Sequence, residues 1–186
     1  MWKSAVRILA PCILVLMTVV GLVACERTEY SQFVTWREEV HLNDGRIIVV
    51  NQKKRLGAGM ARESWLTINL PEFSAQPITW HESLDPLIVN IESGKLYVVG
   101  SPPSVVEEEK YGNPHPDYVG FVWENGTWNR IPFEQIPQQI YDTNMLIDGV
   151  VPAGTTLLTL QQKNGRELNG RATQLPGLLR LDPHFR

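Results

Sequence analysis

The stretch "YVGFVWENGTWNRI", Tyr118 to Ile131, sets two runs of β-forming residues on either side of the dipeptide Asn125-Gly126. Asn-Gly between such runs is a strong hairpin signal, because both central residues of a type I′ turn need positive φ. This loop places Trp123 directly opposite Trp128, in a non-hydrogen-bonded pair where side chains approach closely. We therefore expect a β-hairpin that carries two paired indoles.

Two other stretches also have a dipeptide that ends in glycine between two β-forming runs, "EEVHLNDGRIIVV" at 38–50 and "PLIVNIESGKLYVV" at 86–99. Asp44-Gly45 suits a type I′ turn, and Ser93-Gly94 is a weaker match. Between these hairpins, "SWLTINLP" and "PITWHES" have the composition of two further strands. The pattern predicts a mainly β fold, an antiparallel meander of about eight strands that forms a sandwich or an incomplete barrel.

The segment after the third hairpin favours short helices. "IPFEQIPQQIYDTNMLI" contains Pro132 and Pro137, so only a helical turn or two fits. Thr159 and Gln162 have the spacing of a capping box that opens a short helix. The apolar "LPGLLRLDPHF" predicts that the C-terminus packs back on the body.

The first hairpin also predicts a register. With a two-residue Asp44-Gly45 loop, Leu42 lies opposite Ile47 and Glu38 lies opposite Asn51. That face is apolar except for Glu38. Glu38 is then either a buried acid and a candidate for catalysis, or a carboxylate near the open end of the hairpin that pairs with Asn51 or an arginine.

The N-terminus has the form of a secretory signal. "MWKSAVR" supplies two positive charges, and the run from Ile8 to Ala24 carries none. A membrane helix that is kept is the alternative. The 17 residues of this run lie at the short end of the spanning range, and Pro11 lies near its start.

Leu22-Val23-Ala24-Cys25 resembles the bacterial lipobox, in which a small residue precedes a cysteine that receives a diacylglyceryl thioether. The resemblance implies cleavage between Ala24 and Cys25 and a lasting membrane anchor on the acylated Cys25. The implied division is 1–24 signal peptide, 25–34 acylated cysteine and tether, and 35–186 a single β-rich domain. Glu26 in place of aspartate implies the outer membrane of the cell envelope, facing the periplasm.

Charge and cysteine content exclude several classes. After Cys25 the chain has 15 basic and 20 acidic residues, a net charge of −5, which disfavours nucleic acid as a partner. "QKKRLG" at 52–57 is then a solvated strand end. No cysteine follows Cys25, so an internal disulfide, a zinc-thiolate site and a cysteine nucleophile are excluded in the processed chain. We expect no cofactor.

No phosphate loop, dinucleotide fingerprint, nucleophile elbow or zinc-protease helix occurs in the sequence. The histidines are scattered, at His41, His81, His115 and His184. His115 and Asp117 lie two residues apart in the proline-rich segment 101–118, where an extended backbone turns both side chains the same way. They are candidates for proton transfer or metal binding, although two ligands are too few for a metal site.

The stretches 35–50 and 114–137 resemble a family of small uncharacterised proteobacterial exported proteins, through the pattern W-x-E-E-V-x-L-x-D-G-R that begins at Trp36. This resemblance implies export and carries over no catalytic residue or ligand.

Three functions follow from these patterns. The first is a non-enzymatic envelope lipoprotein that contacts an envelope protein or polymer. The second is a small-ligand binder that uses Trp123, Trp128 and the 101–118 loop, although cross-strand packing alone also explains the two indoles. The third is an envelope hydrolase that uses His115 and Asp117.

Overall fold

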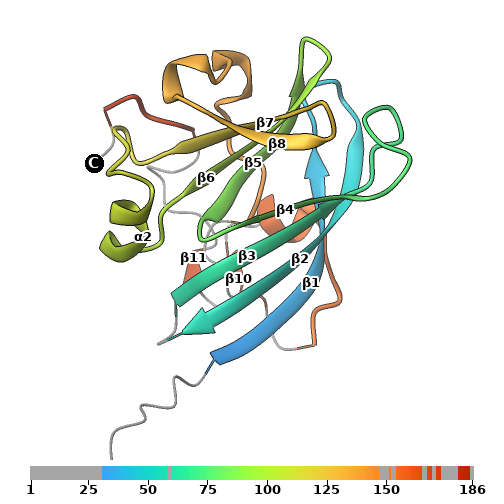
Figure 1. Ribbon diagram of the computed structural model, residues 1–186. Coiled ribbons are helices and arrows are strands. Elements are labelled where there is room, and N and C mark those ends of the chain that lie inside the picture. Colours follow the sequence, from blue (N-terminus) through green and yellow to red (C-terminus); the bar gives the residue numbers. More distant parts are fainter. Residues whose placement is uncertain are drawn as a thin grey trace, which may run out of the picture. The chain divides into compact units, whose positions relative to one another are not determined.

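The computed structural model describes residues 31–57, 60–146, 151, 154–164, 167–168, 171–172 and 180–184 (Figure 1). All of them belong to one compact unit, 31–186. Ala24, Cys25 and the rest of the predicted signal and lipid attachment site lie outside the described residues.

The described residues are mainly β, in two open antiparallel-rich sheets that do not close into a barrel, which confirms the predicted class. The five-stranded sheet has the order β4-β3-β2-β1-β9, with β1 Ser31–His41, β2 Ile47–Gly57, β3 Met60–Ile68, β4 Ile78–Glu82 and β9 Leu157–Leu158. The four-stranded sheet has the order β5-β6-β7-β8, with β5 Asp85–Glu92, β6 Lys95–Ser101, β7 Val119–Glu124 and β8 Thr127–Ile131. The expected strands are β1 to β8, each paired with its sequence neighbour within its sheet.

Smaller elements complete the fold. Their bounds are α2 Val105–Lys110, η1 Phe133–Gln135, η2 Gln138–Ile140, α3 Leu160–Asn164, β10 Glu167–Leu168 and β11 Arg171–Ala172. The two turns η1 and η2 confirm the short helical turns predicted around Pro132 and Pro137, whereas α2 lies inside 101–118, which we expected to be a loop. The Thr159 backbone N–H donates to Gln162 Oε1 at 2.8 Å, so the capping box at the start of α3 is present.

The main core lies between the two sheets. It takes alternate side chains from both, among them Val40, Leu66, Trp80, Val98 and Phe121. A second cluster covers the opposite face of the four-stranded sheet, where η1, η2 and Leu181 pack on Val99 and Val122. Leu181 is buried, which confirms that the C-terminal segment folds back.

Two of the three hairpins have the predicted turns. Asn125 and Gly126 have φ values of 54° and 77°, and Trp123 pairs with Trp128. Ser93 and Gly94 form the same kind of turn, with φ values of 50° and 74°. A local sequence signal therefore fixes the register of these hairpins.

The predicted register of the first hairpin is wrong by one residue. Leu42 and Arg46 pair across a three-residue loop, in which Gly45 alone has positive φ, at 87°. The Asp44 carboxylate accepts hydrogen bonds from the backbone N–H and Nε of Arg46, which favours this loop. Glu38 consequently pairs with Val50 and not with Asn51.

This slip reverses the face of every β2 side chain. Ile47 and Val49, predicted to face inward, are 58% and 44% exposed. Gln52 and Lys54 are buried in their place. Lys54 donates to Asp85 Oδ1 at 2.7 Å, so the prediction of a solvated strand end at 52–57 is wrong for this residue.

The first strand begins at Ser31, so residues 31–34 of the predicted tether belong to β1. None of the helices in the described part of the chain has the length and apolar character that crossing a bilayer requires.

Candidate binding site

The outer face of the five-stranded sheet carries a hollow of about 560 Å³. Strands β1 to β4 each send alternate side chains to this face. The residues that line the hollow are Thr35, Trp36, Arg37, Asn51, Gln52, Lys53, Trp65, Thr67, Thr79, Thr155 and Thr156.

The strand register arranges most of these side chains in two adjacent rows. One row runs through Thr35, Lys53, Trp65 and His81, and the next runs through Arg37, Asn51, Thr67 and Thr79. Directly opposed residues on one face of an antiparallel pair have their Cβ atoms about 5 Å apart, so each row is in contact across the strands. The site is therefore built mainly on four strands, with Thr155 and Thr156 added from the segment that precedes β9.

Aromatic rings hold the Lys53 ammonium in place. Its Nζ lies 4.7 Å from the centre of the Phe33 ring and 4.8 Å from that of Trp65. These two rings are themselves 6.1 Å apart, and Trp65 stacks on His81 at 4.4 Å with 15° between the planes. Cation–π attraction thus positions a positive charge at one side of the hollow.

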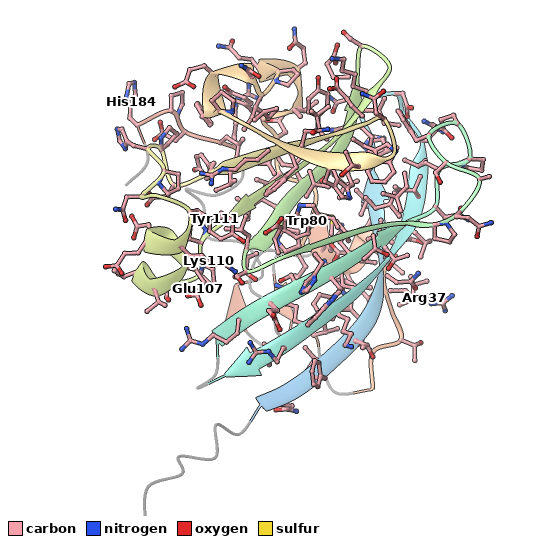
Figure 2. The ribbon with its side chains drawn as sticks, viewed as in Figure 1. Arg37, Trp80, Glu107, Lys110, Tyr111 and His184 are labelled. Atoms are coloured by element: carbon pink, nitrogen blue, oxygen red, sulfur yellow. The ribbon has the colours of Figure 1, made fainter. Side chains whose placement is uncertain are left out.

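The hollow has an unbalanced positive charge. Within the described residues, the side chains of Arg37 and Lys53 form neither an ion pair nor a hydrogen bond, and no aspartate or glutamate lines the hollow. Figure 2 shows Arg37 extending away from the body of the protein. Other basic side chains are paired with carboxylates, namely Arg46, Lys54, Arg55, Arg62, Lys95, Lys163 and Arg180.

Glu38, the predicted candidate acid, is fully buried and its carboxylate is saturated by donors. One oxygen accepts from Trp36 Nε1 at 3.1 Å and from Gln52 Nε2 at 2.8 Å. The other accepts from the Leu146 backbone N–H at 2.6 Å and from Lys163 Nζ at 3.0 Å. A buried carboxylate with this set of donors has a structural role, because it joins β1 and β2 to Leu146 and α3.

Trp123 and Trp128 are half-buried and pack against the core between the sheets. Their rings meet edge to face, 5.2 Å apart at 63°. Trp128 Nε1 donates to the backbone oxygen of Thr79 at 3.0 Å, which joins β8 to β4. This contact gives the pair a structural part in holding the two sheets together.

The remaining predicted residues do not line the hollow. His115 is exposed, and Asp117 is partly buried. His41 and His184 are exposed as well, while His81 belongs to the aromatic group beside the hollow. Across the part of the chain that the structure describes, no three His, Cys, Asp or Glu side chains gather to hold a metal ion.

A polar cluster joins α2 to the connection between β4 and β5, and no motif in the sequence indicates it. The Tyr111 hydroxyl donates to Glu82 Oε2 at 2.7 Å and accepts from the Ser83 backbone N–H at 2.9 Å. Lys110 Nζ donates to Ser83 Oγ at 2.7 Å. Figure 2 shows Glu107, Lys110 and Tyr111 grouped at α2.

Burial raises the pKa of Tyr111, and the hydrogen bond to Glu82 raises it further. Glu107 behaves differently: burial acts to raise the pKa of its carboxyl, but hydrogen bonds from Ser104 and Arg62 outweigh burial and lower it. At neutral pH Tyr111 is therefore neutral and Glu107 is negatively charged. The hydrogen bonds of both residues hold α2 against β3 and the β4–β5 connection.

The fold and the hollow define an open, two-sheet β protein with a solvent-facing site on one sheet. Comparison of the chain with protein-family models, with curated proteins and with solved structures finds no match. The resemblance of 35–50 and 114–137 to exported proteobacterial proteins stays a prediction.

Proposed function

We propose that the chain is a lipid-anchored, non-enzymatic binding protein of the bacterial cell envelope, and that it contacts an envelope partner through the hollow. The observation that carries this proposal is the pair of cations, Arg37 and Lys53, in a hollow to which the described part of the chain brings no acidic side chain. The resemblance of 22–25 to a lipobox supports a lipid anchor on Cys25. The proposed location is the outer membrane, on the side that faces the periplasm.

The size and the lining of the hollow support binding. Ligand pockets in proteins measure about 300–1,000 Å³ and combine an apolar wall with a few placed polar groups. The volume of about 560 Å³, the Trp65 wall and the threonine hydroxyls fit that description. The sheet does not need these groups for its core, because they point away from it.

The environment of Glu38 supports a non-enzymatic role. Catalytic carboxylates need access to substrate and a free position for a proton. The Glu38 carboxylate is enclosed and accepts four hydrogen bonds, from Trp36, Gln52, Leu146 and Lys163. It is therefore poorly suited to proton transfer with a substrate.

Metabolic labelling tests the anchor. A fatty acid analogue should label the wild-type chain and leave Cys25→Ser unlabelled, while the far-ultraviolet circular dichroism of the two stays the same. Label that persists on Cys25→Ser would refute the attachment site.

Photo-crosslinking in intact cells tests the hollow. A photo-reactive residue at Thr35, in the hollow, should yield a crosslinked product that is missing when the same residue replaces Thr127, the exposed first residue of β8. Equal products at both positions, or none at Thr35, would refute binding through this face.

A further inference from the structure

We infer that the hollow binds an acidic glycan, a chain of sugar rings that carry carboxylate groups. This inference rests on the proposed function and names the class of its ligand. Three features of the hollow lead to it, namely its charge, its hydroxyl groups and its position on a sheet face.

The charge of the hollow selects an anion. Arg37 and Lys53 lie on neighbouring strands, diagonal to one another, because Arg37 pairs with Asn51 and Thr35 pairs with Lys53. Diagonal neighbours of this kind are about 7–8 Å apart, so the two cations can engage one ligand that carries several carboxylates. The protein as a whole is acidic, so this local positive charge does not follow from its composition.

The polar lining selects a hydroxylated ligand. Five threonines and Asn51 line the hollow, and their hydroxyl and amide groups both donate and accept hydrogen bonds. Sugar hydroxyls have the same dual character. Trp65 adds apolar surface beside these groups, with His81 stacked on its ring and Lys53 Nζ over it.

The position of the hollow disfavours a peptide. A peptide that binds a sheet normally adds a strand at an edge, where backbone groups are unpaired. The hollow lies over the face of β1 to β4, whose backbone groups are already paired with one another. A ligand held there must bind through side chains, as a carboxylated sugar does.

Calorimetry with a matched pair of glycans tests the inference. The full-length chain in detergent micelles is titrated with oligogalacturonate and with its fully methyl-esterified form, in which each carboxylate is replaced by an uncharged methyl ester. We expect the free acid to bind at least about tenfold more tightly than the ester, with affinity that falls as salt rises.

Charge-matched variants locate the binding. Arg37→Gln and Lys53→Gln should each weaken oligogalacturonate binding by about tenfold. Arg46→Gln and Lys95→Gln remove the same charge outside the hollow and should leave the affinity unchanged. Thr67→Val keeps the side-chain shape, removes a hydroxyl from the hollow, and should weaken binding several-fold.

Several results would overturn the inference. Equal affinity for the acid and the ester would remove the role of charge, and equal loss in all four charge variants would show a non-local effect. Poly-glutamate that binds as tightly as oligogalacturonate would make the ligand an acidic peptide. If none of these probes binds while the crosslink at Thr35 persists in cells, the ligand class is wrong and the proposed function stands; if the crosslink also fails, both fall.

Discussion

Lys163 Nζ donates a hydrogen bond to Glu38 Oε1 at 3.0 Å, across 125 positions of the sequence. The Glu38 residue is fully buried and Lys163 is 4% exposed. The bond attaches α3 to β1 on the inner face of the five-stranded sheet. Next to it, Leu146 and Leu158 pack on Trp36 in a small cluster of their own.

Removal of the Lys163 ammonium should destabilise the fold strongly. Lys163→Met leaves the Glu38 charge buried without its cation, and breaking a buried pair in this way costs about 3–5 kcal/mol. Urea unfolding followed by tryptophan fluorescence measures the change. Lys95→Met, which breaks an exposed pair with Glu124, is the control and should have a far smaller effect. The double variant Glu38→Leu/Lys163→Met should recover part of the loss; equal midpoints for wild type and Lys163→Met would contradict a structural pair.

The sequence predicted those features that depend on neighbouring residues. The Asn125-Gly126 turn determines the pairing of Trp123 with Trp128, because the turn and both strands are contiguous. Two partners of Glu38, Leu146 and Lys163, could not be predicted in this way, because they lie 108 and 125 positions away in the sequence. Lys163 comes from α3, and nothing near either residue in the sequence indicates that they meet.

The candidate site was missed because of one loop. With a two-residue loop at Asp44-Gly45, Lys53 would face the interior and Lys54 would face solvent. The three-residue loop exchanges them, so that Lys53 lies between Phe33 and Trp65 on the outer face. The Asp44 side chain that caps this turn favours the three-residue loop, and the length of the loop decides which lysine is buried.

Substitution of Gly45 should destabilise the protein through backbone conformation alone. Gly45 has a φ of 87°, and a Cβ built there meets no heavy atom within 4 Å. Gly45→Ala should therefore cost about 1–2 kcal/mol, the penalty for an L residue in the left-handed region. Gly45→Asn should cost less, since asparagine tolerates this region. Thermal unfolding measures both, and an alanine variant as stable as wild type would contradict the assigned turn.

Gly120 should not tolerate a side chain. A Cβ at this position would lie 2.7 Å from Ile136 Cγ1 and 2.9 Å from Ile131 Cγ1, so η1 could not pack on β7 as it does. We expect Gly120→Ala to lower the free energy of unfolding by about 1–3 kcal/mol. Adding Ile136→Ala, which removes both Cγ1 and Cδ1, should relieve the contact with Ile136 and make the double variant more stable than the sum of the single effects predicts. Strict additivity in urea unfolding would argue against the clash.

Stability should fall at alkaline pH because buried tyrosines have raised pKa values. Burial raises the pKa of Tyr97, Tyr111, Tyr118 and Tyr141. In the unfolded chain a tyrosine ionises near pH 10. Below that pH the tyrosines are protonated in both the folded and the unfolded chain, so their contribution to folding stability is fully present. As pH rises above it the unfolded state ionises first, so stability decreases until the folded pKa is passed.

Tyr111→Phe separates one of these tyrosines from the rest. At pH 8 the variant should be less stable by about 1–3 kcal/mol, because the Ser83 backbone N–H loses its acceptor and Glu82 loses a donor. Above pH 10 its stability should fall less steeply than that of wild type, since one group with a raised pKa is gone. Urea midpoints between pH 8 and pH 11.5 measure both effects, and lysine ionisation, common to both proteins, cancels in the comparison. Parallel curves over this range would show that Tyr111 keeps its ordinary pKa in the folded protein.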